Sequence, residues 1–107
     1  MNKLIAVLLL TGLASTSQAA RTDSEKSELC RVVKELAEVT MDNRLSGVDV
    51  VESMRIANSA SSDERALVRE IVIKAYSSPN YKTDEYKESA IKDFGTEYYL
   101  DCIKHAK

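Results

Sequence analysis

Apolar residues recur at three- and four-residue steps along most of the chain after residue 22, with charged residues between them. This spacing is that of an amphipathic α-helix, and no stretch alternates strictly between apolar and polar residues as a half-buried strand does. Only one proline and three glycines interrupt 107 residues. The pattern therefore predicts an all-α fold, and its interruptions divide it into four helices.

The first two predicted helices are joined by a short stop. The first begins at Asp23 or Ser24, both good N-caps, and runs to about Asn43. Its apolar face consists of Leu29, Val32, Val33, Leu36, Val39 and Thr40. Ser46-Gly47 ends it, and a shorter helix over about 48–58 follows. On that helix we expect Val48, Val51 and either Met54 or Ile56 to face inward.

The last two predicted helices have clear starts. Ser61-x-x-Glu64 is a capping-box sequence, and the helix it opens ends before Ser77-Ser78-Pro79-Asn80. Its apolar positions are Leu67, Val68, Ile71, Val72, Ala75 and Tyr76. The final helix opens at Thr83, and Gly95 in its interior indicates either a kink or a close approach of another backbone. Its inward edge is Tyr86, Ala90, Ile91, Phe94, Tyr98 and Cys102, widened by Leu100 and Ile103.

Residues 1–19 have the layout of a secretory signal peptide. A basic start at Lys3 precedes an apolar run over 4–14, and Ser17 and Ala19 occupy the −3 and −1 positions of a cleavage site. The run is too short to span a bilayer, so no stable membrane insertion is expected after cleavage, and no cysteine follows for lipid attachment. The sequence thus predicts a signal peptide over 1–19 and a single helical domain over 20–107, in the periplasm or secreted.

Two cysteines, Cys30 and Cys102, lie near the two ends of this domain. In an oxidising compartment they are most simply interpreted as one disulfide, with two free thiols or an intermolecular bridge as alternatives. They do not form a C-x-x-C pair, which disfavours a thiol-exchange enzyme. A bridge would require the first and last helices to pack side by side. The resulting prediction is a small four-helix bundle stapled by the Cys30–Cys102 disulfide.

Charge and chemistry narrow the function classes. The chain carries 15 basic and 17 acidic residues, interspersed and without a basic block, which disfavours nucleic acid as a partner. The single histidine, His105, lies one helical turn after Asp101, and we interpret it as a surface cation at a helix C-terminus. No zinc-ligand spacing or phosphate-binding loop is present. We therefore predict no catalytic residue, no metal, no cofactor and no enzymatic activity.

Four residues are candidates for binding a partner. Tyr98 and Tyr99 are adjacent and point about 100° apart on a helix, so both cannot easily be buried. They and Tyr81 either cover the rim of the core or anchor an interface. Arg44, in the turn after the first helix, either binds an acidic partner or caps carbonyls at the end of that helix.

The spacing of several residues resembles that of small exported bacterial and prophage-encoded two-cysteine helical proteins of unassigned function. The shared positions are Cys30, Met41-x-x-Arg44-x-x-Gly47, Ala75-Tyr76-x-x-Pro79, Phe94 and Cys102. The resemblance covers most of the domain and implies a bacterial, periplasmic setting. It carries no activity or site residue.

These observations favour a non-enzymatic protein-binding module whose partner is another periplasmic or envelope protein. Such a module would be an inhibitor, an immunity protein or an envelope accessory factor. The alternative is an acid-stress periplasmic chaperone, because many carboxylates lose charge on acidification while a disulfide keeps a loosened bundle together. An enzyme is the least favoured class, and it would need a polar pocket around Asp101 and His105.

Overall fold

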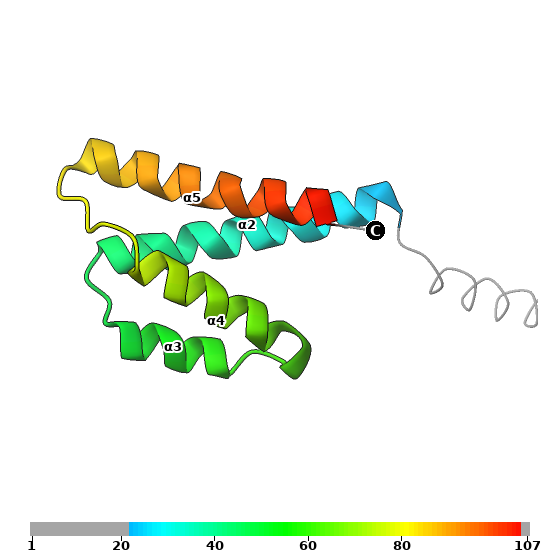
Figure 1. The fold of residues 1–107 in the computed structure, drawn as a ribbon, viewed down its shortest axis with the longest axis horizontal. Helices are drawn as coiled ribbons and strands as arrows, with labels where there is room; N and C mark the ends of the chain where they lie inside the picture. Colours follow the sequence, from blue (N-terminus) through cyan, green and yellow to red (C-terminus); the bar gives the residue numbers. More distant parts are fainter. Residues whose placement is uncertain (1–21, 106–107) are drawn as a thin grey trace, which may run out of the picture.

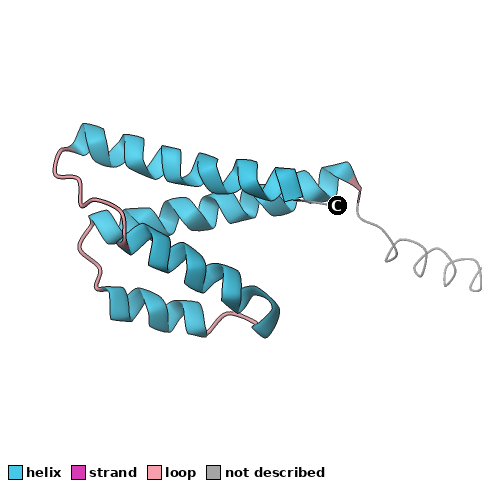
Figure 2. Cartoon of the chain, in the orientation of Figure 1, coloured by secondary structure: helices cyan, strands magenta, loops and turns pink. Residues whose placement is uncertain are grey.

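The computed structural model describes residues 22–105, and the regular structure in that range is entirely helical (Figure 1, Figure 2). The helices are α2 (Asp23–Leu45), α3 (Val50–Asn58), α4 (Ser62–Tyr76) and α5 (Asp84–His105). The prediction of an all-α fold with four helices is confirmed. The predicted signal peptide falls on residues outside the described range.

The two long helices, α2 and α5, lie side by side and run in opposite directions (Figure 1). A disulfide joins Cys30, in the first turns of α2, to Cys102 near the end of α5, with 5.5 Å between their Cα atoms. The predicted pairing of the cysteines is therefore confirmed. The bond ties the start of α2 to the end of α5, and Cys30 is fully buried there.

Side-chain caps set the first turns of the helices, but not all where the sequence indicated. The N-cap of α2 is Thr22, one residue before the predicted caps: its hydroxyl accepts from Glu25 N–H and the Glu25 carboxylate accepts from Thr22 N–H, both at 3.1 Å. The capping box predicted at Ser61 and Glu64 is wrong. The Ser61 hydroxyl instead donates to the Glu64 carboxylate at 2.8 Å and caps no backbone N–H.

The turn between α2 and α3 lies about two residues later than the sequence suggested. Gly47 adopts φ +91°, a left-handed conformation that side chains disfavour. Asp49 then caps α3 by accepting from Val51 N–H at 2.9 Å, so the helix begins at Val50 rather than near 48. Thr83 is the predicted start of α5, and its hydroxyl accepts from Tyr86 N–H at 3.3 Å.

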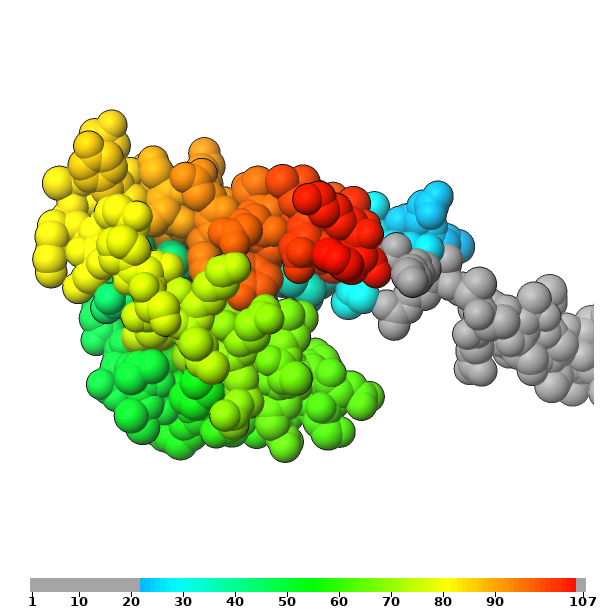
Figure 3. All heavy atoms as spheres, viewed as in Figure 1, coloured from blue at the N-terminus to red at the C-terminus, as the bar shows by residue number. Residues whose placement is uncertain are grey.

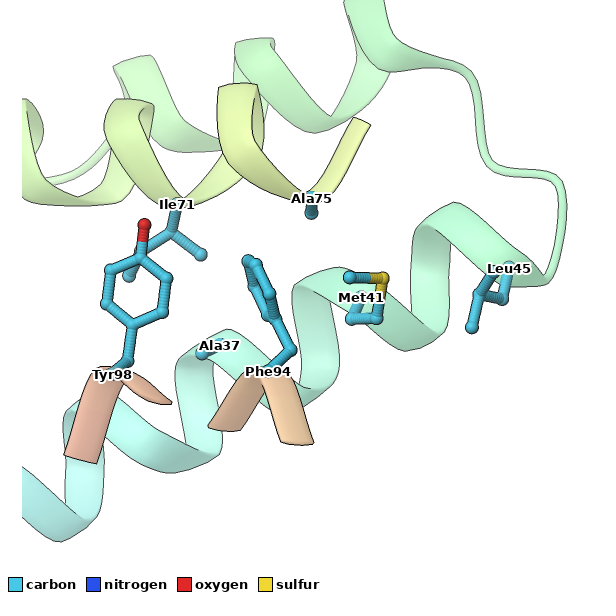
Figure 4. Close-up of a cluster of buried hydrophobic side chains, with 7 residues drawn as sticks. All are labelled: Ala37, Met41, Leu45, Ile71, Ala75, Phe94 and Tyr98. Atoms are coloured by element: carbon cyan, nitrogen blue, oxygen red, sulfur yellow. The ribbon is translucent and has the colours of Figure 1, made fainter. Parts of the chain in front are cut away.

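The main core lies where α2, α4 and α5 meet (Figure 4). It consists of Ala37, Met41, Leu45, Ile71, Ala75, Phe94 and Tyr98. The rings of Phe94 and Tyr98 pack edge to face with centroids 5.2 Å apart. The small Ala37 and Ala75 face this pair from α2 and α4 (Figure 4). Helix α3 adds no member to this cluster and packs outside it.

Half of the apolar face predicted for the first helix does not face the core. Leu29, Val32 and Val39 are 45%, 49% and 57% exposed, so their prediction as inward residues is wrong. The disulfide and the contact with α5 turn a neighbouring face of α2 inward, the face that carries Cys30 and Ala37. Other residues predicted to face inward are also exposed: Val51, Leu67, Tyr86, Leu100 and Ile103. Of the two alternatives on α3, Met54 is partly buried and Ile56 is exposed.

Gly95 marks a close approach between α5 and α2. A Cβ built at Gly95 would lie 2.5 Å from Glu38 Cγ, which is closer than carbon atoms can pack. The Glu38 carboxylate meanwhile pairs with Lys34 at 2.7 Å and is only a quarter exposed. Gly95 therefore leaves the space that the Glu38 side chain fills between the two helices.

We expect Gly95→Ala to lower the free energy of unfolding by about 1 kcal/mol, because overpacking outweighs the better helix propensity of alanine. In a Glu38→Ala background, which removes the clashing atoms, the same change should raise stability by about 1 kcal/mol. Urea denaturation of the four proteins measures both effects. Equal effects of Gly95→Ala in the two backgrounds would contradict the contact.

Candidate functional site

An exposed row of apolar side chains runs along α2. Leu29, Val32, Leu36 and Val39, here called the α2 stripe, follow one another at steps of three, four and three residues. That spacing places them on one face of the helix. Leu29, Val32 and Val39 are each about half exposed, and Leu36 is partly buried. A continuous apolar row of this kind on a surface is typical of a binding site.

The C-terminal half of the stripe enters a shallow groove between α2, α3 and α4. The groove has a volume of about 80 Å³ and is lined by Leu36, Val39, Thr40, Asn43, Ser53, Ile56, Ala57, Val68 and Val72. Ile56 on α3 is 58% exposed and extends the apolar surface across the groove. The N-terminal half, with Leu29 and Val32, lies outside it.

One edge of the stripe is acidic. Glu28, Glu35 and Asp42 recur at seven-residue intervals, each directly before a stripe residue or Asn43, and all three are exposed. Arg31 forms ion pairs with Glu28 and Glu35, and its hydrogen bond to Glu28 holds the pKa of that carboxyl below its usual value. One cation among three carboxylates leaves the edge with an excess of negative charge.

A second hollow, of about 340 Å³, opens between α4 and α5. It is lined by Glu70, Lys74, Glu97, Tyr98, Leu100, Asp101 and Lys104. Lys74 pairs with Glu97 at 2.7 Å, and the Tyr98 hydroxyl donates to the Glu70 carboxylate at 3.2 Å. The Lys74 ammonium lies 5.5 Å from the centre of the Tyr98 ring. The charged groups that line this hollow thus link α4 to α5 across its opening.

Burial, followed by the Glu70 carboxylate, raises the pKa of the Tyr98 hydroxyl well above its ordinary value. The folded state therefore favours the neutral phenol, so this contribution to stability is complete below about pH 10 and is lost as the pH rises further. We expect Tyr98→Phe to lose less stability than the wild type between about pH 9 and pH 11. Urea midpoints at the two pH values measure this. Parallel losses in both proteins would show that Tyr98 does not titrate as described.

The three candidate tyrosines are not brought together. Tyr81 lies in the loop before α5 and is 36% exposed, whereas Tyr98 is 5% exposed and belongs to the core. Tyr99 is half-buried. About 20 Å of α5 separates Tyr98 and Tyr99 from the loop that holds Tyr81. Tyr98 thus belongs to the core and also lines the α4–α5 hollow.

Arg44 links two ends of helices. Its guanidinium stacks on the Tyr76 ring at 5.6 Å and donates to the Ser78 carbonyl at 3.2 Å. It therefore caps a carbonyl after α4. The sequence had instead suggested carbonyls at the end of α2. The Tyr76 hydroxyl donates to the Val48 carbonyl at 2.7 Å and lies 2.8 Å from the Ser53 hydroxyl. Together these bonds fix the start of α3 against α2 and α4.

His105 does contact Asp101, as its spacing suggested. Its Nδ1 lies 2.8 Å from the Asp101 carbonyl and 3.4 Å from the carboxylate, and both side chains are more than two-thirds exposed. Among residues 22–105, no three His, Cys, Asp or Glu side chains are grouped so that they could hold a metal ion. None of the helices in this range has the length and apolarity to cross a membrane.

Sequence reasoning missed the α2 stripe as a surface because the same periodicity is typical of a core face. The acidic residues at seven-residue intervals, Glu28, Glu35 and Asp42, were the available signal. Such charges commonly flank the apolar seam between two paired helices. A core face of a bundle does not need them.

No protein-family model matches the chain, and neither a curated protein nor a solved structure is significantly similar to it.

Proposed function

We propose that this protein acts in the periplasm, or secreted, as a non-enzymatic module that binds another periplasmic or envelope protein. As an inhibitor, immunity protein or accessory factor it would work sterically, by covering a surface of its partner. The exposed α2 stripe carries the proposal, because Leu29, Val32 and Val39 leave their apolar surface in water on a well-formed helix.

Rigidity supports binding at this position. Cys30 follows Leu29 directly, and its bond to Cys102 fixes the first turns of α2 against α5. A surface that is ordered before binding loses little conformational entropy when a partner docks. The predicted signal peptide and the disulfide both support an oxidising compartment.

Site-specific cross-linking tests the proposal. A photoreactive residue at Val32 should capture one specific protein from a periplasmic extract at physiological salt, because Val32 lies in the centre of the exposed stripe. The matched control carries the same group at Ile73 on α4, which is similarly exposed at 54%. Capture from neither position, or the same background from both, would contradict the proposed function.

The acid-stress chaperone is supported by one observation, the charged links between α4 and α5. The pairs Lys74–Glu97 and Tyr98–Glu70 depend on carboxylates that are neutral in strong acid. Their loss would loosen α4 from the buried Tyr98 while the disulfide holds α2 to α5. Dye binding and protection of an aggregating client at about pH 2–3 would favour this function, and an unchanged fold there would exclude it.

A further inference from the structure

The α3–α4 hairpin covers only part of the length of α2. Helix α3 has 9 residues and α2 has 23, so their lengths are about 14 and 34 Å. The α3–α4 hairpin lies along the C-terminal half of α2, and the first turns of α2 extend beyond it (Figure 1, Figure 3). Leu29 and Val32, in this N-terminal part of the α2 stripe, are 45% and 49% exposed. Within residues 22–105, the N-terminal half of the α2 stripe is thus only half covered.

The pattern along the whole α2 stripe is that of one side of a helix pair. Leu29, Val32, Leu36 and Val39 have the alternating three- and four-residue spacing of a coiled-coil seam. The acidic residues Glu28 and Glu35 flank that seam at the positions that face the edge of a partner helix. The surface therefore matches an amphipathic helix with apolar residues at the same spacing and positive charges along one edge.

We propose that the α2 stripe binds an amphipathic helix of the partner protein, with Lys or Arg along the edge that meets Glu28 and Glu35. This helix packs on Leu29, Val32 and Leu36, along the part of α2 that extends beyond the α3–α4 hairpin. The inference rests on the proposed protein-binding function and specifies the chemistry of the partner.

The same charges disfavour a second copy of this chain as the occupant. A two-fold pair of antiparallel α2 helices, centred on the stripe, would place Glu35 opposite Glu35 of the second copy and Glu28 opposite Asp42. Like charges facing each other across a seam oppose association. A basic helix instead meets an edge whose three carboxylates outnumber its one cation, Arg31.

Two synthetic helical peptides of about three heptads test the proposal. Both carry Leu and Val at the seam positions, one with Lys and the other with Glu along the flanking edge. With the purified, disulfide-bonded protein, fluorescence anisotropy should show the Lys peptide binding at least about tenfold more tightly than the Glu peptide, with a preference that weakens as salt rises. The double variant Glu28→Lys/Glu35→Lys should reverse the preference.

Apolar contact is tested separately. Val32→Ser should weaken binding of the Lys peptide by about tenfold, because it removes a central seam contact from an exposed position that the fold does not need. Ile73→Ser, an equally exposed change on α4, should leave binding unchanged. Circular dichroism confirms that each variant is folded.

Several outcomes would overturn this inference. They are no binding of either peptide, equal binding of both, no reversal by the double variant, or a dimer in analytical ultracentrifugation that Val32→Ser abolishes. Failure of the proposed function is distinguishable from these. If a partner captured at Val32 binds the double variant as tightly as the wild type, protein binding stands and the basic helix is excluded; if no partner is captured, the function itself fails.

Discussion

Replacing both cysteines, Cys30→Ser/Cys102→Ser, should lower the free energy of unfolding by about 4 kcal/mol. The bond spans 72 residues, and its removal restores a large conformational entropy to the unfolded chain. A serine hydroxyl at the fully buried position of Cys30 adds to the loss. Because small domains are stable by only about 5–15 kcal/mol, this change removes a large share of the total. Urea denaturation of both proteins measures it.

Reduction of the wild type with dithiothreitol provides the control for the substituted side chains. It breaks the same bond without a new hydroxyl at Cys30, and it should lower the urea midpoint by a similar amount. A double variant as stable as the wild type would show that the packing of α2 against α5 does not depend on the disulfide.

Phe94→Ala should cost about 3–5 kcal/mol, because it leaves a cavity where α2, α4 and α5 meet. Phe94 is 5% exposed and loses its edge-to-face contact with Tyr98 in the same change. Small residues such as Ala37 and Ala75 opposite the ring cannot fill the space. We therefore also expect partial loss of the near-ultraviolet circular dichroism of the tyrosines.

The matched control is Tyr86→Ala, an aromatic residue on the same helix that is 63% exposed. Its loss should change stability by no more than about 0.5 kcal/mol, because most of its surface already contacts water. Equal effects of the two substitutions would place the core of the protein elsewhere.

The helices could be predicted from sequence because their signals are local. Thr83, Pro79 and Ser46-Gly47 act on the few residues beside them, so the ends of helices were located to within about two residues. The disulfide followed from cysteine count and compartment alone. The capping residues were harder to predict. Thr22, Ser61 and Asp49 each have a neighbour with a similar side chain that could also cap the helix.

The side of α2 that faces the core could not be predicted in the same way. Periodicity groups residues on one face. Whether the face of Leu29 and Val32 is covered depends on how far α3 and α4 reach along α2, and these helices come much later in the sequence. Tyr98 and Tyr99 show the same limit. Their angular separation indicated that one would be more buried than the other, and only the packing of α4 determines that it is Tyr98.

The bond between Arg44 and the Ser78 carbonyl places the exit from α2 next to the return toward α5. The α3–α4 hairpin is therefore an excursion that starts and finishes at one corner, while α2 and α5 form a closed frame of their own. Within this excursion α4 packs on the frame through Ile71 and Ala75, whereas α3 adds no residue to the shared core. An exchange confined to α3 should consequently change what lies beside the C-terminal half of the α2 stripe, while the covalently locked pair and its core with α4 stay intact.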